Sequence, residues 1–136
     1  MIDRVQIVPE NAIARLGGGK VPAVKVQFEA QAYSNGPDLV ENTEDDELIG
    51  VFPASWSKAN FDAIAESLQD ASFAGDIDQQ GLFSPAPAGI NSERYIPTNN
   101  TGVLAIIGEV NDGARTVRGQ SRLVVTVQRF IDPPIR

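Results

Sequence analysis

Apolar and polar side chains alternate most clearly between residues 24 and 33. The apolar positions are Val24, Val26, Phe28, Ala30 and Ala32, and Lys25, Gln27, Glu29 and Gln31 stand between them. A period of two turns one face of a β-strand towards a core and the other towards solvent. The pattern therefore predicts a strand over residues 24–33 that forms part of a sheet sandwich.

Further strand signals recur about every ten residues, separated by turn-forming residues. They cover residues 4–8, 48–57, 72–75, 81–83, 103–110 and 116–130. Residues 103–110 are apolar on both faces, which is typical of a central strand, and Asn111-Asp112-Gly113 indicates a turn before the last strand. Residues 85–101, rich in Pro, Gly and Asn, are expected to form an exposed loop.

The period changes in one place, at residues 59–69. Phe61, Ile64, Ala65 and Leu68 are spaced as one stripe of an amphipathic helix, and Ser57 is a plausible N-cap. The pattern predicts one short helix near residues 58–69 within an otherwise all-β chain. The fold class expected is an antiparallel β-sandwich of Greek-key type formed by residues 1–136 as a single domain, with a small closed barrel as the alternative.

Composition removes several classes of chemistry. The 136 residues include no Cys and no His, which excludes disulfides, thiolate nucleophiles, His-dependent catalysis and zinc sites built from these residues. The net charge of −7 disfavours a nucleic-acid partner. No apolar stretch is long enough to insert into a membrane, and residues 1–9 show no secretory signal.

An acidic segment is the candidate metal site. Residues 38–47 carry six acids and no base, and Asp38, Asp45 and Asp46 are the candidate Ca²⁺ ligands. The segment lacks the glycine that an EF-hand loop requires, so a solvated acidic loop is the favoured interpretation, with docking to a partner as a further alternative.

Two other features have competing interpretations. Trp56, the one tryptophan, is expected in the core rather than on a sugar-binding surface, because it follows a strand rich in apolar residues. Asp76 and Asp78 resemble a carboxylate pair for acid–base catalysis, but they flank Gln79-Gln80-Gly81, where a turn-capping role is favoured.

The order of elements resembles bacterial immunoglobulin-like domains, chiefly through residues 73–78, 81–86, 102–110 and 123–127. A narrower resemblance runs through nearly the whole chain, from about Val5 to Arg136. Its segments are residues 26–30, 34–38, 45–46, 53–57, 73–75, 125–130 and 132–136. In these segments the chain is similar to the C-terminal immunoglobulin-like domain of the quinohemoprotein amine dehydrogenase alpha subunit.

This resemblance implies a structural role in an oxidoreductase complex. Enzymes of that family are periplasmic and oxidise primary amines to aldehydes. They contain haem c in the large subunit, a propeller subunit, and a small subunit with a cysteine–tryptophylquinone cofactor. With neither Cys nor His, this chain carries none of those cofactor sites. The expected role is a non-catalytic subunit or domain, periplasmic or extracellular, with haem-bearing and propeller subunits as partners.

The C-terminal segment is the expected partner interface. Phe130, Pro133, Pro134 and Ile135 are apolar there, and Arg129 and Arg136 provide polar anchors. The last 26 residues carry a charge of +3, opposite in sign to that of the acidic segment. This uneven charge can steer docking to a partner, or it can equally protect an exposed strand edge.

Two other functions compete with this one. An independent binding or structural module, such as a surface-adhesion or virion-decoration domain, predicts self-assembly or ligand binding with no redox partner. A small carboxylate-dependent enzyme requires two acids in one pocket.

Overall fold

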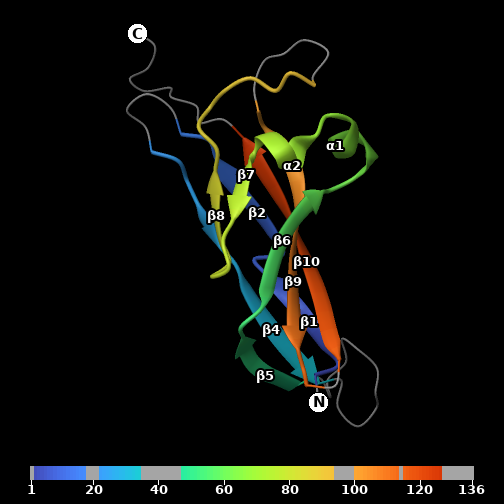
Figure 1. Cartoon of the computed structure of the whole chain (residues 1–136). Helices are drawn as coiled ribbons and strands as arrows, with labels where there is room; N and C mark the ends of the chain where they lie inside the picture. Colours follow the sequence, from blue (N-terminus) through green and yellow to red (C-terminus); the bar gives the residue numbers. More distant parts are fainter. Residues whose placement is uncertain (1, 18–21, 35–46, 94–99, 114, 127–136) are drawn as a thin grey trace.

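A computed structural model describes residues 2–17, 22–34, 47–93, 100–113 and 115–126 (Figure 1). The strands are β1 (Arg4–Val8), β2 (Asn11–Arg15), β3 (Val26–Gln27), β4 (Glu29–Ser34), β5 (Glu47–Phe52), β6 (Ser55–Asn60), β7 (Gly75–Ile77), β8 (Leu82–Pro85), β9 (Gly102–Asn111) and β10 (Thr116–Thr126). The helices are α1 (Ala63–Ser67) and α2 (Asp70–Phe73). Neither helix has the length and apolarity needed to span a membrane.

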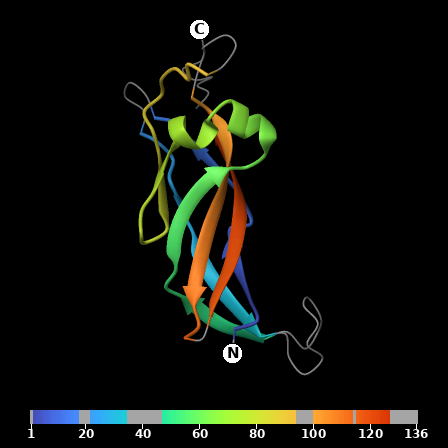
Figure 2. The ribbon, with the colours of Figure 1, turned by 45° about the vertical axis from the view of Figure 1, so that its right-hand side comes forward.

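The strands form two main sheets and one small sheet. The main sheets have the orders β1-β4-β5 and β2-β10-β9-β6, and the small sheet has the order β3-β8-β7. The helices lie at one end of the elongated molecule and β5 lies at the other (Figures 1 and 2). The predicted all-β sandwich is confirmed, and the described strands do not close into a barrel.

One strand pair departs from the antiparallel prediction. β2 runs parallel to β10, with Arg122 opposite Asn11 and Thr126 opposite Arg15, while the other pairs are antiparallel. The sequence pattern did not predict β2, because its five residues follow β1 closely across Pro9 and lack a long alternation. The four-stranded sheet is therefore mixed.

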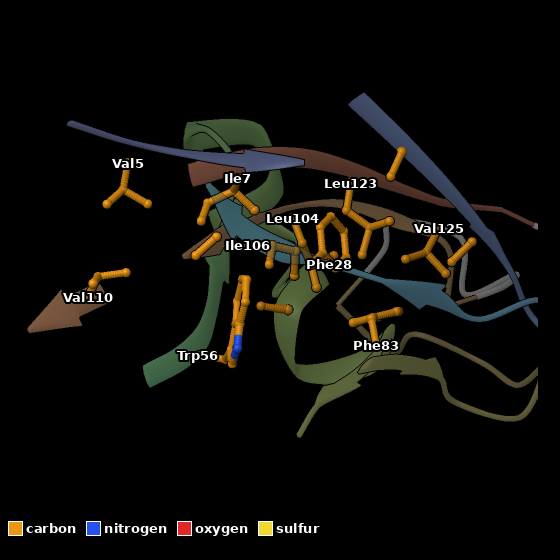
Figure 3. Close-up of a cluster of buried hydrophobic side chains, with 14 of the residues drawn as sticks. Val5, Ile7, Phe28, Trp56, Phe83, Leu104, Ile106, Val110, Leu123 and Val125 are labelled. Carbon is orange, nitrogen blue, oxygen red and sulfur yellow. The ribbon is translucent and has the colours of Figure 1, made fainter. Parts of the chain in front are cut away.

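The core lies between the two main sheets. Inward side chains of β9 and β10, including Leu104, Ile106 and Leu123, meet Ile7 from β1 and Phe28 from the segment between β3 and β4 (Figure 3). All five are almost completely buried. β9 was predicted as a central strand, and it does lie between β10 and β6.

The predicted strand 24–33 is interrupted at Phe28. The amide of Phe28 donates to the carbonyl oxygen of Gly81 at 2.8 Å, and β3 before it pairs with β8. β4 after it pairs with β1 and β5 instead. The alternation placed Phe28, Ala30 and Ala32 inside correctly, but Val24 is 44% exposed.

The helical region begins later than predicted. β6 continues to Asn60 because it pairs with β9 along its whole length, so Ser57 belongs to a strand and is not an N-cap. The cap of α1 is Asp62, whose carboxylate accepts from the Ala65 amide at 2.8 Å. Residues 70–73, expected in part as a strand, form α2.

The described part of the loop after β8 is mostly exposed, as predicted, but two of its asparagines are buried. Asn91 donates to the Leu68 carbonyl oxygen at 2.8 Å, and Asn100 donates to that of Phe73 at 2.9 Å. Both asparagines are almost fully buried. Their amides satisfy carbonyl groups at the helices, so the loop is tied to the helical end of the sandwich at these two residues.

Candidate interaction surface

The strand β5 forms one edge of the β1-β4-β5 sheet. It pairs with β4 through the Tyr33–Leu48, Gln31–Val51 and Ala30–Phe52 positions, and no described strand pairs with its other side. Alternate backbone amide and carbonyl groups of an edge strand point away from the sheet. β5 therefore presents a row of backbone groups that another strand can pair with.

The side chains of β5 are apolar and largely uncovered. Leu48, Ile49 and Val51 are 55%, 44% and 57% exposed. Leu48 and Val51 share one face of the strand, and Ile49 lies at a register shift between β5 and β4. Only Phe52, at the end of β5, packs against the core. Natural edge strands are usually shielded by charges, prolines or covering segments, so an exposed apolar edge marks a contact surface.

A groove continues from the end of β5 across the molecule. It has a volume of about 400 Å³. Its apolar lining includes Val51, Phe52 and Trp56, and Gln27, Gln79 and Gln80 contribute polar groups. Trp56 packs its ring on Phe28, with the ring centroids 6.5 Å apart, and is only 7% exposed. Trp56 is thus a core residue, as predicted, with one edge that reaches the groove.

The opposite wall of the groove is held by two glutamine side chains. The Gln27 amide donates to the Gln80 carbonyl oxygen at 2.7 Å, which fixes the turn after β7 against β3. The Gln79 amide donates to the Trp56 carbonyl oxygen at 3.2 Å, and its Oε1 accepts from the Trp56 amide at 3.4 Å. The groove is therefore a preformed feature of the fold.

These Gln79 contacts also close the edge of the other main sheet. β6 is an edge strand, and Gln79 supplies to Trp56 the donor and the acceptor that a neighbouring strand would supply. Two residues further on, the Lys58 ammonium donates to the Ala71 and Gly75 carbonyl oxygens and pairs with Asp76 at 2.8 Å. β6 is therefore covered by its own chain, whereas β5 is not covered by any described segment.

A second apolar area lies on the outer face of the four-stranded sheet. Ile13, Val124 and Val103 are in line across β2, β10 and β9, and Ile64 and Leu68 from the helical region flank a hollow of about 300 Å³ nearby. Ile64 is 71% exposed. This area lies at the helical end, far from β5 (Figures 1 and 2).

The residues predicted as sites lie outside the described residues. This is true of the candidate Ca²⁺ ligands Asp38, Asp45 and Asp46. It is also true of the expected interface residues Arg129, Phe130, Pro133, Pro134, Ile135 and Arg136. Both assignments stay predictions. Within the part of the chain that is described, no three acidic residues lie close enough together to hold a metal ion.

The Asp76 and Asp78 carboxylates have structural partners. Asp78 Oδ1 accepts from the Gln80 and Leu82 amides at 2.9 and 3.0 Å, which is the predicted turn-capping role. Asp76 pairs with Lys58. The groove beside β5 has one carboxylate residue in its lining, Glu29, so these residues do not assemble a pair of acids in that groove.

Sequence reasoning missed the open edge itself. Residues 48–57 were expected to be extended, but their apolar content was not linked to an exposed surface. The available signal was the position of Leu48-Ile49-Gly50-Val51 directly after the acidic segment 38–47. Charged residues that flank an apolar strand are typical of a strand that stays accessible to solvent in the isolated protein.

Comparison with known proteins gives one family. The model of quinohemoprotein amine dehydrogenase alpha subunit domain IV matches residues 5–135, nearly the whole chain. The match includes both main sheets and the groove. No curated protein matches the chain.

Proposed function

Because the chain belongs to the family of quinohemoprotein amine dehydrogenase alpha subunit domain IV, we propose that it is a non-catalytic structural domain of such an enzyme. It works in the periplasm, attached to or assembled with haem-bearing and propeller subunits that carry out primary amine oxidation. The observation that supports this role most directly is the family match over residues 5–135, together with an apolar edge strand that its own described residues leave open.

The donor set of the chain does not fit the cofactors that the family name implies. Covalent attachment of haem c uses two cysteines and a histidine, and this sequence contains neither residue type. A quinone derived from Cys and Trp side chains also requires a cysteine, and Trp56 is buried against Phe28. The haem and quinone therefore belong to other parts of the assembly, and this domain contributes surface.

Co-purification tests this role. A tagged full chain, isolated from its source organism under native conditions, should elute with a haem-containing protein and with amine-dependent dye reduction. The same chain purified alone should show neither haem absorbance nor amine oxidation. Elution without a haem partner, as a monomer or a self-assembled form, contradicts the proposal and favours the independent module. Activity of the chain alone contradicts the non-catalytic role.

The C-terminal segment remains the contact predicted from sequence. A variant that lacks residues 132–136 should fold normally, with an unchanged thermal transition, and should bind the haem-bearing partner less tightly. A truncated variant with unchanged affinity shows that Pro133, Pro134, Ile135 and Arg136 are not part of the interface. Arg129→Ala with Phe130→Ala tests the remaining two residues in the same assay.

A further inference from the structure

We propose that β5 is the docking edge of this domain, and that its occupant is an extended segment of another part of the same enzyme. That segment adds to the β1-β4-β5 sheet as a fourth strand. It carries apolar side chains at alternate positions and Lys or Arg near its ends. The inference rests on the proposed function, because it names a second surface, besides the C-terminal segment, through which the domain contacts the assembly.

The open backbone of β5 supplies the first reason. Strand addition uses unpaired amide and carbonyl groups at a sheet edge, while alternating side chains give specificity. β5 ends the order β1-β4-β5. It is six residues long, with a register shift against β4 at Ile49. β6 ends the other main sheet, but Gln79 already occupies the backbone groups of Trp56.

The apolar side chains supply the second reason. Leu48 and Val51 lie on one face of β5 and are 55% and 57% exposed. Ile49 lies at the register shift between β5 and β4 and is 44% exposed. An added strand covers part of both faces, because its own side chains lie beside those of its neighbour. The groove at Phe52 and Trp56 then receives the side chain that follows the end of the added strand.

Charge indicates which kind of segment fits. Glu47 begins β5 directly after the acidic residues of segment 38–46, and Glu29 lies in the groove lining at the other end. Both ends of the edge are therefore acidic. A segment with basic residues near its ends is attracted to this edge, and the attraction raises its association rate.

The same charges disfavour a second copy of this chain as the occupant. Antiparallel pairing of two β5 strands would bring Glu47 of each copy towards the end where Glu29 of the other copy lies. Like charges in such positions destabilise a strand pair. The net charge of −7 adds a general repulsion between copies.

Paired substitutions test the proposal in the co-purified complex. Ile49→Lys with Val51→Lys should weaken binding to the haem-bearing partner by about tenfold or more, because apolar contacts are lost and the new charges shield the edge. Ile64→Lys with Ile90→Lys is the matched control, since these side chains are 71% and 65% exposed and lie away from β5. The control should bind like the unmodified chain.

A charge variant and hydrogen exchange provide independent readouts. Glu47→Lys should slow association, most strongly at low salt, whereas Glu66→Lys on α1 should not. In the complex, the outward amides of β5 should exchange more slowly than in the free chain. This measurement uses the unmodified chain, so it does not depend on how well a substituted variant folds.

The outcomes separate this inference from the proposed function. If a complex forms but β5 exchanges freely and the β5 variants bind normally, the docking edge is wrong while the structural role stands. If the free chain dimerises and its β5 amides become protected, the occupant is a second copy and the assigned partner is wrong. If no complex forms with a haem-bearing protein, the structural role is wrong and the docking edge is wrong with it.

Discussion

The strands β5 and β9 are similar in composition and opposite in environment. β9 contains Val103-Leu104-Ala105-Ile106-Ile107, and β5 contains Leu48-Ile49-Gly50-Val51-Phe52. β9 lies between β10 and β6, and its inward residues Leu104 and Ile106 are fully buried. β5 has one neighbour among the described strands, and three of its apolar side chains are about half exposed.

The difference shows that the apolar composition of a strand does not indicate whether the same chain or a partner buries it. In β9 the cover is the same chain, which supplies a strand on each side and the opposite sheet (Figure 3). In β5 the described chain supplies a cover on one side only. Apolar surface of this kind contributes to folding in the first case and to association in the second, through the same hydrophobic effect.

The largest expected effect comes from removing a cover of β9. Trp56→Ala should lower the free energy of unfolding by about 3–5 kcal/mol, because the indole ring is 7% exposed and lies against Gly108 of β9. Denaturant titration measures the loss. A loss below about 1 kcal/mol would mean that the ring is not part of the core and would reopen a binding role for it.

A matched pair of substitutions compares the two strands directly. Leu104→Ala in β9 should cost about 2–5 kcal/mol, since the side chain is fully buried and leaves a cavity. Leu48→Ala in β5 should cost less than about 1 kcal/mol, since that side chain is more than half exposed. Equal costs, measured by the same titration, would show that β5 is covered in the free chain and that the comparison fails.

A smaller effect is expected from opening the edge of β6. Gln79→Ala removes both side-chain contacts with Trp56, so the Trp56 amide should exchange faster, and stability should fall by about 1 kcal/mol. Gln80→Ala is the control, because the Gln80 contacts with Gln27 and Asp78 use its backbone carbonyl and amide, which the substitution keeps. Unchanged exchange at Trp56 would mean that Gln79 does not protect this edge.

The smallest effect is expected from metal removal. The favoured interpretation of the segment 38–47 is a solvated acidic loop, so EDTA should leave the thermal transition unchanged. A Ca²⁺ site at Asp38, Asp45 and Asp46 would instead raise stability with free Ca²⁺ by mass action. A large fall in the transition temperature with EDTA would therefore establish the metal site. Bound Ca²⁺ would then reduce the negative charge of the segment that precedes β5.

Local patterns predicted the elements whose contacts repeat along the chain. Residues 4–8 and 103–110 were predicted correctly because alternation or a continuous apolar run records burial on one or two faces. The helical spacing at residues 61–68 correctly indicated a helix in this region, but of the four residues in the stripe only Ala65 is buried. Pairing with β9 extends β6 to Asn60. Tertiary pairing therefore overrode the predicted start of the helix.

Long-range partners explain what the sequence did not reveal. The parallel pairing of β2 with β10 joins residues more than a hundred positions apart, and no local period encodes such a partner. Burial of Asn91 and Asn100 likewise depends on carbonyl groups of the distant helices. The edge of β5 is open because no described strand pairs with its free side. The residues of β5 alone do not indicate how many neighbouring strands it has.

The contrast between β5 and the Gln79-protected edge of β6 has a consequence for valency. A domain with two accessible sheet edges can accept one strand and offer another, so that identical units propagate into a fibre. Here Gln79 covers the β6 edge of the four-stranded sheet at Trp56, while no described strand pairs with the free side of β5. Of these two edges, such a unit can accept a strand at β5 without offering one at β6, and substitution of Gln79 would be the shortest route to opening the second edge.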